Sequence, residues 1–270
     1  MASKRPSMEG TQSIERAVIL LRALAGRGRF GWSLTELAAA AGITKTTAYR
    51  ILSRLEHERL VHRGDRGDRY FIGFAIGELS LCIPGYHDFV TQAHSCALST
   101  ARKLSLVTIV YLRSGDHFVI ASRIDSAHMR SRINEEGAYR PLISTAGGVA
   151  ILMTLPEAEQ KRVLAANVRE LSMRGRTQLS DCHAMLERSR RLGVGTNFGD
   201  IGAGTNAIAV PFFGDGSQAI GSLAVAGPDS QLTEARCMEL VPLLQLQAGL
   251  LEPMARELSL GPGARREAEG

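Results

Sequence analysis

The sequence predicts an α+β fold in two parts: a small helical N-terminal domain with a β-hairpin, and a larger domain of mixed helices and strands. Three observations support this. Apolar residues recur at helical spacing through residues 12–25, 34–41 and 45–56. Residues 105–125 and 207–228 each hold two β-rich runs around a turn. Helices and strands of the second part follow no repeating βαβ order.

Composition sets the broad class. The 270 residues suffice for two domains, and the contents of 44% hydrophobic and 22% charged residues are typical of a soluble globular protein. No apolar run has the length of a membrane span, and the N-terminus does not resemble a secretory signal, so we expect a cytoplasmic protein without membrane contact. The four cysteines lack metal-site spacing, which predicts free thiols and no metal centre.

Charge is distributed unevenly along the chain. The formal net charge is +5, but residues 1–73 carry +6 and residues 74–270 carry −1. A basic unit joined to a near-neutral body indicates that the first part meets a polyanion. A chance imbalance of surface charge is the alternative.

A glycine triplet at Gly26, Gly28 and Gly31 has the spacing G-x-G-x-x-G of a dinucleotide site. In the segment before it, the apolar residues Ile14, Val18, Leu21 and Ala25 recur at helical spacing, so no strand leads into the triplet. No acidic residue follows at the required distance of about 20 residues. We therefore expect a loop between two helices and no bound cofactor.

The next segment predicts a helix-turn-helix. Ser33 and Glu36 form a capping box that opens a short helix, and Gly42 ends it. Thr44 then caps a second helix over residues 45–56, whose apolar residues have the spacing of a buried face. Two helices joined by a short turn with glycine are typical of this DNA-binding motif.

The second helix is the predicted recognition helix, because small hydroxyl side chains and cations lie near its N-terminal end. Such groups bind phosphates or base edges. The alternative is the solvated face of an ordinary helical hairpin. The predicted DNA contacts are Thr44, Lys45, Thr46, Thr47, Tyr49, Arg50 and Arg54.

Two short strands, residues 60–63 and 69–72, are predicted around the turn "GDRGD". Arg63, Arg66 and Arg69 decorate this hairpin. Three helices followed by a basic hairpin indicate a winged helix-turn-helix, and we add Arg66 to the predicted DNA contacts.

At this point the sequence resembles the IclR family of bacterial transcriptional regulators. The resemblance begins with "QSIERAVILLRALA", continues through "WSLTELAAAAGITKTTAYRILSRLEHERLV" and "DRYFIG", and resumes with "YRPLISTAGGVAILMTLP", "RRLGVGTNFGDIGAGTNAIAVPFF" and "IGSLAVAGP". It covers roughly residues 11–256. It implies a dimer or dimer of dimers that binds a palindromic double-stranded DNA operator, and a second domain similar to GAF-type sensors that binds a small organic or aromatic acid.

These implications give the expected organisation. The first ten residues are disordered, residues 11–73 form the DNA-binding domain, and residues 74–90 form a linker helix. Residues 91–260 form the effector-binding domain, which includes a possible strand at 129–135 and one long final helix, and residues 261–270 form a disordered tail.

A carboxylate site is predicted where the segment "PLISTAGG" opens a helix, because helix N-termini bind anions and small side chains admit a ligand. Tight packing of the helix on a sheet is the alternative reason for small residues. The resemblance adds residues of a later loop and of the sheet, whose departures from the family pattern favour a larger or more apolar ligand. The predicted effector contacts are Ser144, Thr145, Ala146, Gly147, Asn197, Asp200, Ala207 and Ala224.

An enzyme is not expected. The chain has no G-x-S-x-G elbow and no H-E-x-x-H motif, and its seven histidines are dispersed. We therefore predict no catalytic residues. The functional alternative to a regulator is a metabolite-binding sensor without specific DNA binding.

Overall fold

The computed structural model describes residues 11–26, 30–65, 67–126, 135–173 and 179–259. The chain divides into two compact units between Cys82 and Ile83. Among the described residues, no helix is both long and apolar enough to cross a membrane. Arg66, the terminal segments 1–10 and 261–270, and nearly all of the strand predicted at 129–135 lie outside the described residues.

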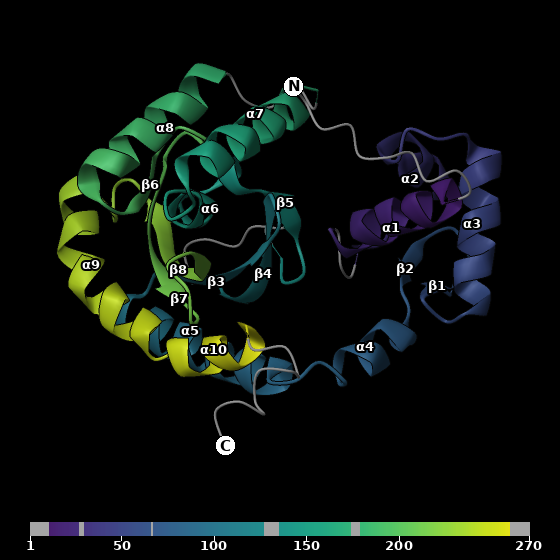
Figure 1. The fold of residues 1–270 in the computed structure, drawn as a ribbon, viewed down its shortest axis with the longest axis horizontal. Coiled ribbons are helices and arrows are strands. Elements are labelled where there is room, and N and C mark those ends of the chain that lie inside the picture. Colours follow the sequence, from purple (N-terminus) through teal and green to yellow (C-terminus); the bar gives the residue numbers. More distant parts are fainter. Residues whose placement is uncertain (1–10, 27–29, 66, 127–134, 174–178, 260–270) are drawn as a thin grey trace. The chain divides into compact units, whose positions relative to one another are not determined.

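The first unit contains the predicted helices and hairpin (Figure 1). Its core brings together side chains from three helices and the hairpin, mainly Leu20, Leu24, Leu37, Leu52 and Val61. The elements are α1 (Gln12–Ala25), α2 (Leu34–Ala40), α3 (Lys45–His57), β1 (Val61–Arg63), β2 (Tyr70–Ile72) and α4 (Phe74–Ser80).

The helix predicted over residues 12–25 is confirmed as α1, but its apolar residues are not all buried. Leu20 and Leu24 are buried in the core, whereas Ile14 is 66% exposed and Val18 is 41% exposed. Apolar residues occur on more than one side of this helix, so periodicity alone permits more than one buried face. Packing against α2 and α3 selects the stripe that contains Leu20 and Leu24.

The single linker helix predicted over residues 74–90 is wrong. Helix α4 ends at Ser80, and α5 (Tyr86–Leu104) begins after Gly85, which has a left-handed φ of +71°. Pro84 precedes this glycine, and a proline disfavours a helical conformation in the residue before it. Helix α5 packs in the second unit, on strands β3 and β4.

A six-stranded antiparallel sheet forms the centre of the second unit, with the strand order β5-β4-β3-β8-β7-β6. The hairpins predicted at 105–125 and 207–228 are confirmed as β3–β4 and β7–β8. The strands are β3 (Val107–Ser114), β4 (His117–Ile124), β5 (Tyr139–Pro141), β6 (Gly195–Phe198), β7 (Thr205–Phe213) and β8 (Ala219–Pro228).

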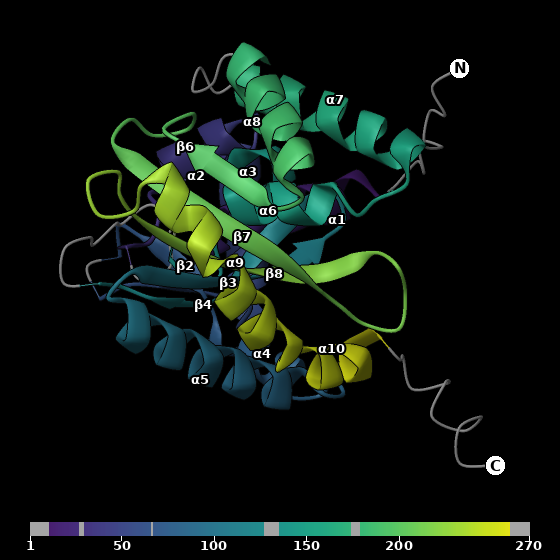
Figure 2. The ribbon, with the colours of Figure 1, turned by 90° about the vertical axis from the view of Figure 1, so that its left-hand side faces the viewer.

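Helices cover both faces of this sheet (Figure 2). On one face lie α6 (Ala146–Leu152), α7 (Glu157–Met173) and α8 (Leu179–Leu192), which share an apolar cluster with the sheet. On the other lie α5, α9 (Glu234–Gly249) and α10 (Glu252–Ser259), with a second cluster. Of the site residues predicted in the second domain, Asn197, Ala207 and Ala224 lie on the sheet face that α6 covers, and the others lie in α6, in the turn before it or in the loop after β6.

The predicted long final helix is divided into α9 and α10. Pro242 lies inside α9, which continues past it to Gly249. Pro253 lies in the first turn of α10, a position that tolerates the missing N–H, and it disfavours a continuous helix through the residue before it.

Ion pairs hold α7 to the β3–β4 hairpin. Arg162 contacts Asp116 through two N–H···O bonds of 2.8 Å, and Arg113 of β3 donates to Glu159 at 2.6 Å. Hydrogen bonding to Arg162 lowers the pKa of Asp116. These contacts anchor the outer helix at the end of the sheet.

Candidate functional site

Local capping fixes how α3 begins. The Ser33–Glu36 capping box is confirmed: the Ser33 N–H donates to Oε2 of Glu36 at 2.9 Å, and the Glu36 N–H donates to Oγ of Ser33 at 3.3 Å. Gly42 has a φ of +62°, which turns the chain between α2 and α3. Thr44 is the N-cap of α3, and its Oγ1 accepts from the Thr47 N–H at 3.2 Å.

The predicted DNA-contact face of α3 lies on the surface. Ala48, Leu52 and Leu55 are buried against the domain core. The side facing away from them contains the predicted contacts: Thr44, Lys45, Thr46, Tyr49, Arg50 and Arg54 are exposed, and Thr47 is half-buried. The helix therefore presents hydroxyl and cationic groups to solvent.

The outward residues of α3 differ in whether they already contact other side chains of the protein. Arg54 pairs with Glu58 at 2.5 Å, across one helical turn. Tyr49 lies on the hairpin side, where the guanidinium carbon of Arg63 is 5.6 Å from its ring centroid. By helical spacing, Thr46 and Arg50 lie between these two edges, on the side of α3 opposite its buried residues.

The hairpin arginines have structural partners. Arg63 also lies 4.9 Å from the ring centroid of Tyr70 and donates from Nε to Oε2 of Glu56 at 3.1 Å. Arg69 donates to the carbonyl oxygens of Phe30 and Gly31 at 3.1 and 3.2 Å, which ties β2 to the loop after α1. The sequence could not distinguish these anchoring roles from contact with a polyanion.

A groove between α1 and α3 brings in two residues that the sequence did not predict as contacts. It has a volume of about 440 Å³, and Ser13 and Arg16 of α1 line it together with Thr47, Arg50 and Arg54 of α3. One sequence feature could have predicted these two contacts: Ser13 and Arg16 lie one turn apart at the start of α1, which packs on α3.

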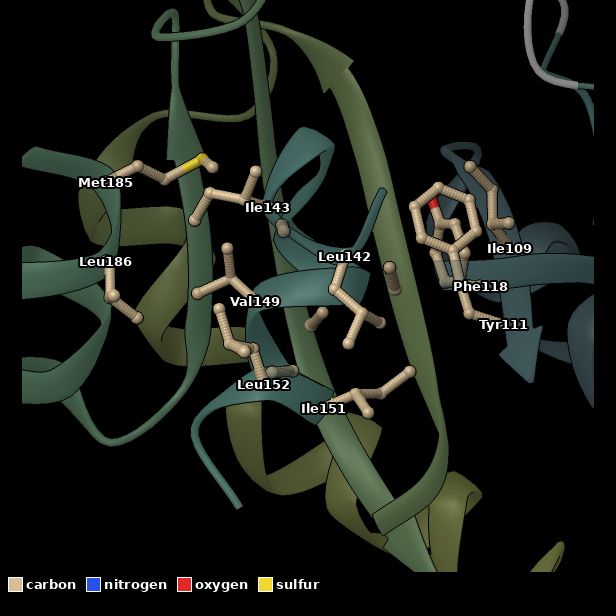
Figure 3. Close-up of a cluster of buried hydrophobic side chains, with 14 of the residues drawn as sticks. Ile109, Tyr111, Phe118, Leu142, Ile143, Val149, Ile151, Leu152, Met185 and Leu186 are labelled. Carbon is tan, nitrogen blue, oxygen red and sulfur yellow. The ribbon is translucent and has the colours of Figure 1, made fainter. Parts of the chain in front are cut away.

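Strand register brings the predicted effector residues of the sheet to one face. Asn197 lies opposite Ala207, Ala207 opposite Ala226, and Ala224 opposite Ile109. Because directly paired residues point to the same side, these side chains share the face covered by α6. Figure 3 shows Ile109 and Tyr111 of this face beside the apolar residues of α6.

The turn at the start of α6 is closely packed. A Cβ atom on Gly147 would lie 2.3 Å from Cδ2 of Tyr111, and one on Gly148 would lie 1.9 Å from the carbonyl oxygen of Leu142. Ser144 and Ala146 are buried beside them. The packing alternative therefore accounts for the two glycines.

The polar groups of this turn are engaged within the fold. Thr145 caps α6 by accepting from the Gly148 N–H at 3.0 Å, and its side chain counteracts part of the rise that burial causes in the pKa of the neighbouring Tyr111. The hydroxyl of Ser144 donates to the carbonyl oxygen of Pro141 at 2.6 Å. Both hydroxyls stabilise the turn in this structure.

Two further predicted residues are also engaged. Both oxygens of Asp200 contact the Arg188 guanidinium, and Oδ2 accepts from the Phe198 N–H at 2.9 Å. Oδ1 of Asn197 accepts from the Ile201 N–H at 3.2 Å. Asp200 thus lies with Arg188 at the β6 edge, so it and Asn197 shape the loop after β6.

Two family models match the chain in the same order as the two units. The model for the IclR helix-turn-helix domain matches residues 13–65, and that for the bacterial transcriptional regulator IclR C-terminal domain matches residues 86–251. The chain belongs to the IclR family. It is therefore a transcriptional regulator with a helix-turn-helix DNA-binding domain and an effector-binding domain, and not an enzyme.

Relatives agree with this assignment, and solved structures share the fold. The "probable transcriptional regulator SauR" of Cupriavidus necator is 28% identical over 80% of this chain and 86% of its own length. An IclR transcriptional regulator structure from Silicibacter sp. TM1040 has a TM-score of 0.71 and 24% identity, covering 90% of this chain and 96% of its own. An IclR homologue of Microbacterium hydrocarbonoxydans, complexed with 4-hydroxybenzoate, has a TM-score of 0.66 and 17% identity, covering 91% and 99%.

The effector domain of this IclR-family chain contains two cations that the sequence analysis missed. Arg123 lies opposite Ile109, and Arg140 lies opposite Phe118, so both residues belong to the α6 face. A bulge at Ala121 shifts the register of β4 and brings Arg123 to this face. The Arg123 side chain is only 8% exposed and pairs with Asp125 at 2.7 Å.

Tyr111 lies near these cations. Burial raises its pKa to about 12, against the opposing effects of Arg123, Thr145 and Arg140. A buried hydroxyl and a buried guanidinium thus share the face with the alanines of β7 and β8. A different cavity, of about 300 Å³, lies on the opposite face between α5 and β4, and none of the predicted effector residues lines it.

Proposed function

We propose that the protein binds a palindromic operator as a dimer or a dimer of dimers, and that a small organic or aromatic acid changes its affinity for DNA. The observation that supports this most directly is the exposed face of α3, where Thr46 and Arg50 point away from the buried side of the helix. Residues at this end of a recognition helix reach base edges in the major groove. Lys45, Thr47 and Tyr49 would contact the same duplex around them.

Exposed apolar side chains support association with a second copy. In the first unit, Ile14 and Val18 of α1, Phe74 and Leu79 of α4, and Leu81 after it are 41–75% exposed. Large apolar side chains exposed to solvent are typical of an interaction surface. A two-fold dimer through this surface would present two copies of α3 and therefore select a palindrome.

The proposed effector site is the α6 face of the sheet. Ala207 and Ala224, with Ala226, give it an apolar floor, and Arg123 adds a cation that can pair with a carboxylate. The bound 4-hydroxybenzoate of the Microbacterium homologue has both an apolar ring and an acid group. We place the acid of the effector at Arg123 rather than at the closely packed turn before α6.

The proposal keeps the domain boundaries expected from the sequence. We assign DNA binding to residues 11–73 and effector binding to residues 91–260, in a protein of the cytoplasm.

DNA binding by the wild-type protein is the first test. We expect a duplex complex whose log K falls linearly with log salt concentration, because phosphate contacts release counterions. Fluorescence anisotropy at several salt concentrations measures this slope. A chain that binds organic acids but no duplex at low salt would instead be the metabolite sensor without DNA binding.

The effector test uses thermal unfolding with benzoate, 4-hydroxybenzoate and phenylacetate. We expect at least one acid to raise the melting temperature of the wild-type protein, because a ligand at 100 times its Kd stabilises the folded state by about 2.7 kcal/mol. Arg123→Met should lower the affinity of the protein for that acid by about tenfold or more, since it removes a charge-assisted contact.

Arg113→Met is the matched control. Arg113 also lies on β3 beside the α6 face, but it contacts Glu159 and Gln218. We expect this variant to melt at a lower temperature and to keep the ligand-induced shift. Equal shifts in both variants would exclude Arg123 as the acid contact, and no shift with any of the acids would contradict the proposed effector class.

A further inference from the structure

The groove between α1 and α3 contains more positive charge than the recognition helix alone supplies. Arg16 of α1 joins Arg50 and Arg54 of α3 along its lining, and no carboxylate is among the residues that line it. Glu15 of the same turn of α1 is exposed and does not line the groove. The groove is therefore a local concentration of cations inside the DNA-binding unit.

The hydroxyl groups of the groove complement these cations. Ser13 lies in the first turn of α1, where the helix dipole favours anions, and Thr47 lies in the first turn of α3. Hydroxyl groups and arginines are common partners of phosphate oxygens. The less exposed apolar lining of the groove, Ala17, Ile51 and Leu55, suits the carbon edge of a sugar.

The three arginines are not equivalent. Arg54 is paired with Glu58 at 2.5 Å, which offsets its charge. Arg50 lies at the rim, next to the outward face that we assign to base contacts. Arg16 is half-buried and comes from the other helix, so it is the cation placed to bind something within the groove.

We propose that this groove binds one phosphate of the DNA backbone, held by Ser13 and Arg16 of α1 and by Thr47 of α3. The inference rests on the proposed DNA binding and adds a second helix to the interface. A phosphate held between the two helices fixes the depth and direction of α3 in the major groove. Because every duplex has the same backbone, this contact contributes equally to all sequences.

The experiment measures binding of the full-length protein to a random-sequence duplex across a range of salt concentrations. Arg16→Gln should weaken binding about tenfold and reduce the salt slope by about 1, the effect of losing one phosphate contact. Arg16→Lys should restore most of the slope, because it keeps the charge. Arg22→Gln, in the last turn of the same helix, is the control for charge and helix composition, since Arg22 does not line the groove.

The outcomes separate the two proposals. If Arg16→Gln behaves like Arg22→Gln while the wild type binds with a normal salt slope, the groove proposal is wrong and DNA binding stands. If the wild type does not bind the duplex at low salt, both fail. Circular dichroism checks that each variant is folded. If Arg16→Gln unfolds, Ser13→Ala replaces it as the test, because Ser13 is exposed. The proposal then holds only if Ser13→Ala weakens binding equally on every DNA sequence.

Discussion

Gly147→Ala is expected to destabilise the effector domain by about 2 kcal/mol, because the added methyl group overpacks a closed core. The new Cβ atom would lie 2.3 Å from Cδ2 and 2.4 Å from Cε2 of Tyr111, and 3.0 Å from Oγ of Ser222. The Tyr111 ring has little room to move, since it is buried and packs edge-on against Phe118, with the ring centroids 4.8 Å apart. Urea unfolding monitored by circular dichroism measures the loss.

Two companion variants test the cause. Gly202→Ala adds the same methyl group where no atom lies within 4 Å, so stability should change little. The Tyr111→Leu variant lacks the aromatic ring. In that background, Gly147→Ala should lower the free energy of unfolding by less than it does in the wild type, and a double-mutant cycle measures the difference. A contrary outcome is that the Gly147→Ala variant keeps the stability of the wild type and loses only its response to acids. That result would show that a ligand, and not the packing of the core, requires a glycine at position 147.

Arg50→Ala should cost about 1–3 kcal/mol of operator affinity, concentrated at one base pair, if its guanidinium reads a base edge. Its exposed position at the centre of the outward face of α3 is the reason for this assignment. The measurement compares Kd values for a duplex selected from a random pool and for its single-base-pair variants. Arg102→Ala, in the last turn of α5 in the other unit, removes the same charge and should leave the pattern unchanged.

The pattern of losses decides between two kinds of contact. Equal weakening on every duplex would show that Arg50 binds a phosphate and would leave Thr46 as the remaining outward candidate. Full retention of affinity would mean that this face of α3 does not meet DNA, which would contradict the proposed function.

Local signals account for the parts of the fold that the sequence predicted well. Capping at Ser33 and Thr44 depends on residues three positions apart, so the limits of α2 and α3 were predictable to within one or two residues. The break before α5 had a local signal too, the pair Pro84 and Gly85, which the helical periodicity around it obscured.

Contacts between distant residues explain what the sequence could not predict. The α1 stripe is selected by partners on other helices, so Ile14 and Leu20 look equivalent in the sequence. Strict alternation along β4 would place Arg123 on the face opposite to Phe118, and only the bulge at Ala121 reverses this. The partner of Asp200 is likewise fixed by the chain path after β6, which brings it to Arg188.

The segment between α4 and α5 contains a cysteine that can be labelled selectively. Cys82 is exposed there, whereas Cys96, Cys182 and Cys237 are buried, and burial raises the pKa of each of those three thiols and so disfavours the reactive thiolate. A maleimide dye applied to the native protein will therefore modify Cys82 first. Fluorescence from that single label can then report, without any engineered mutation, on the stretch of chain that joins the DNA-binding unit to the sensor.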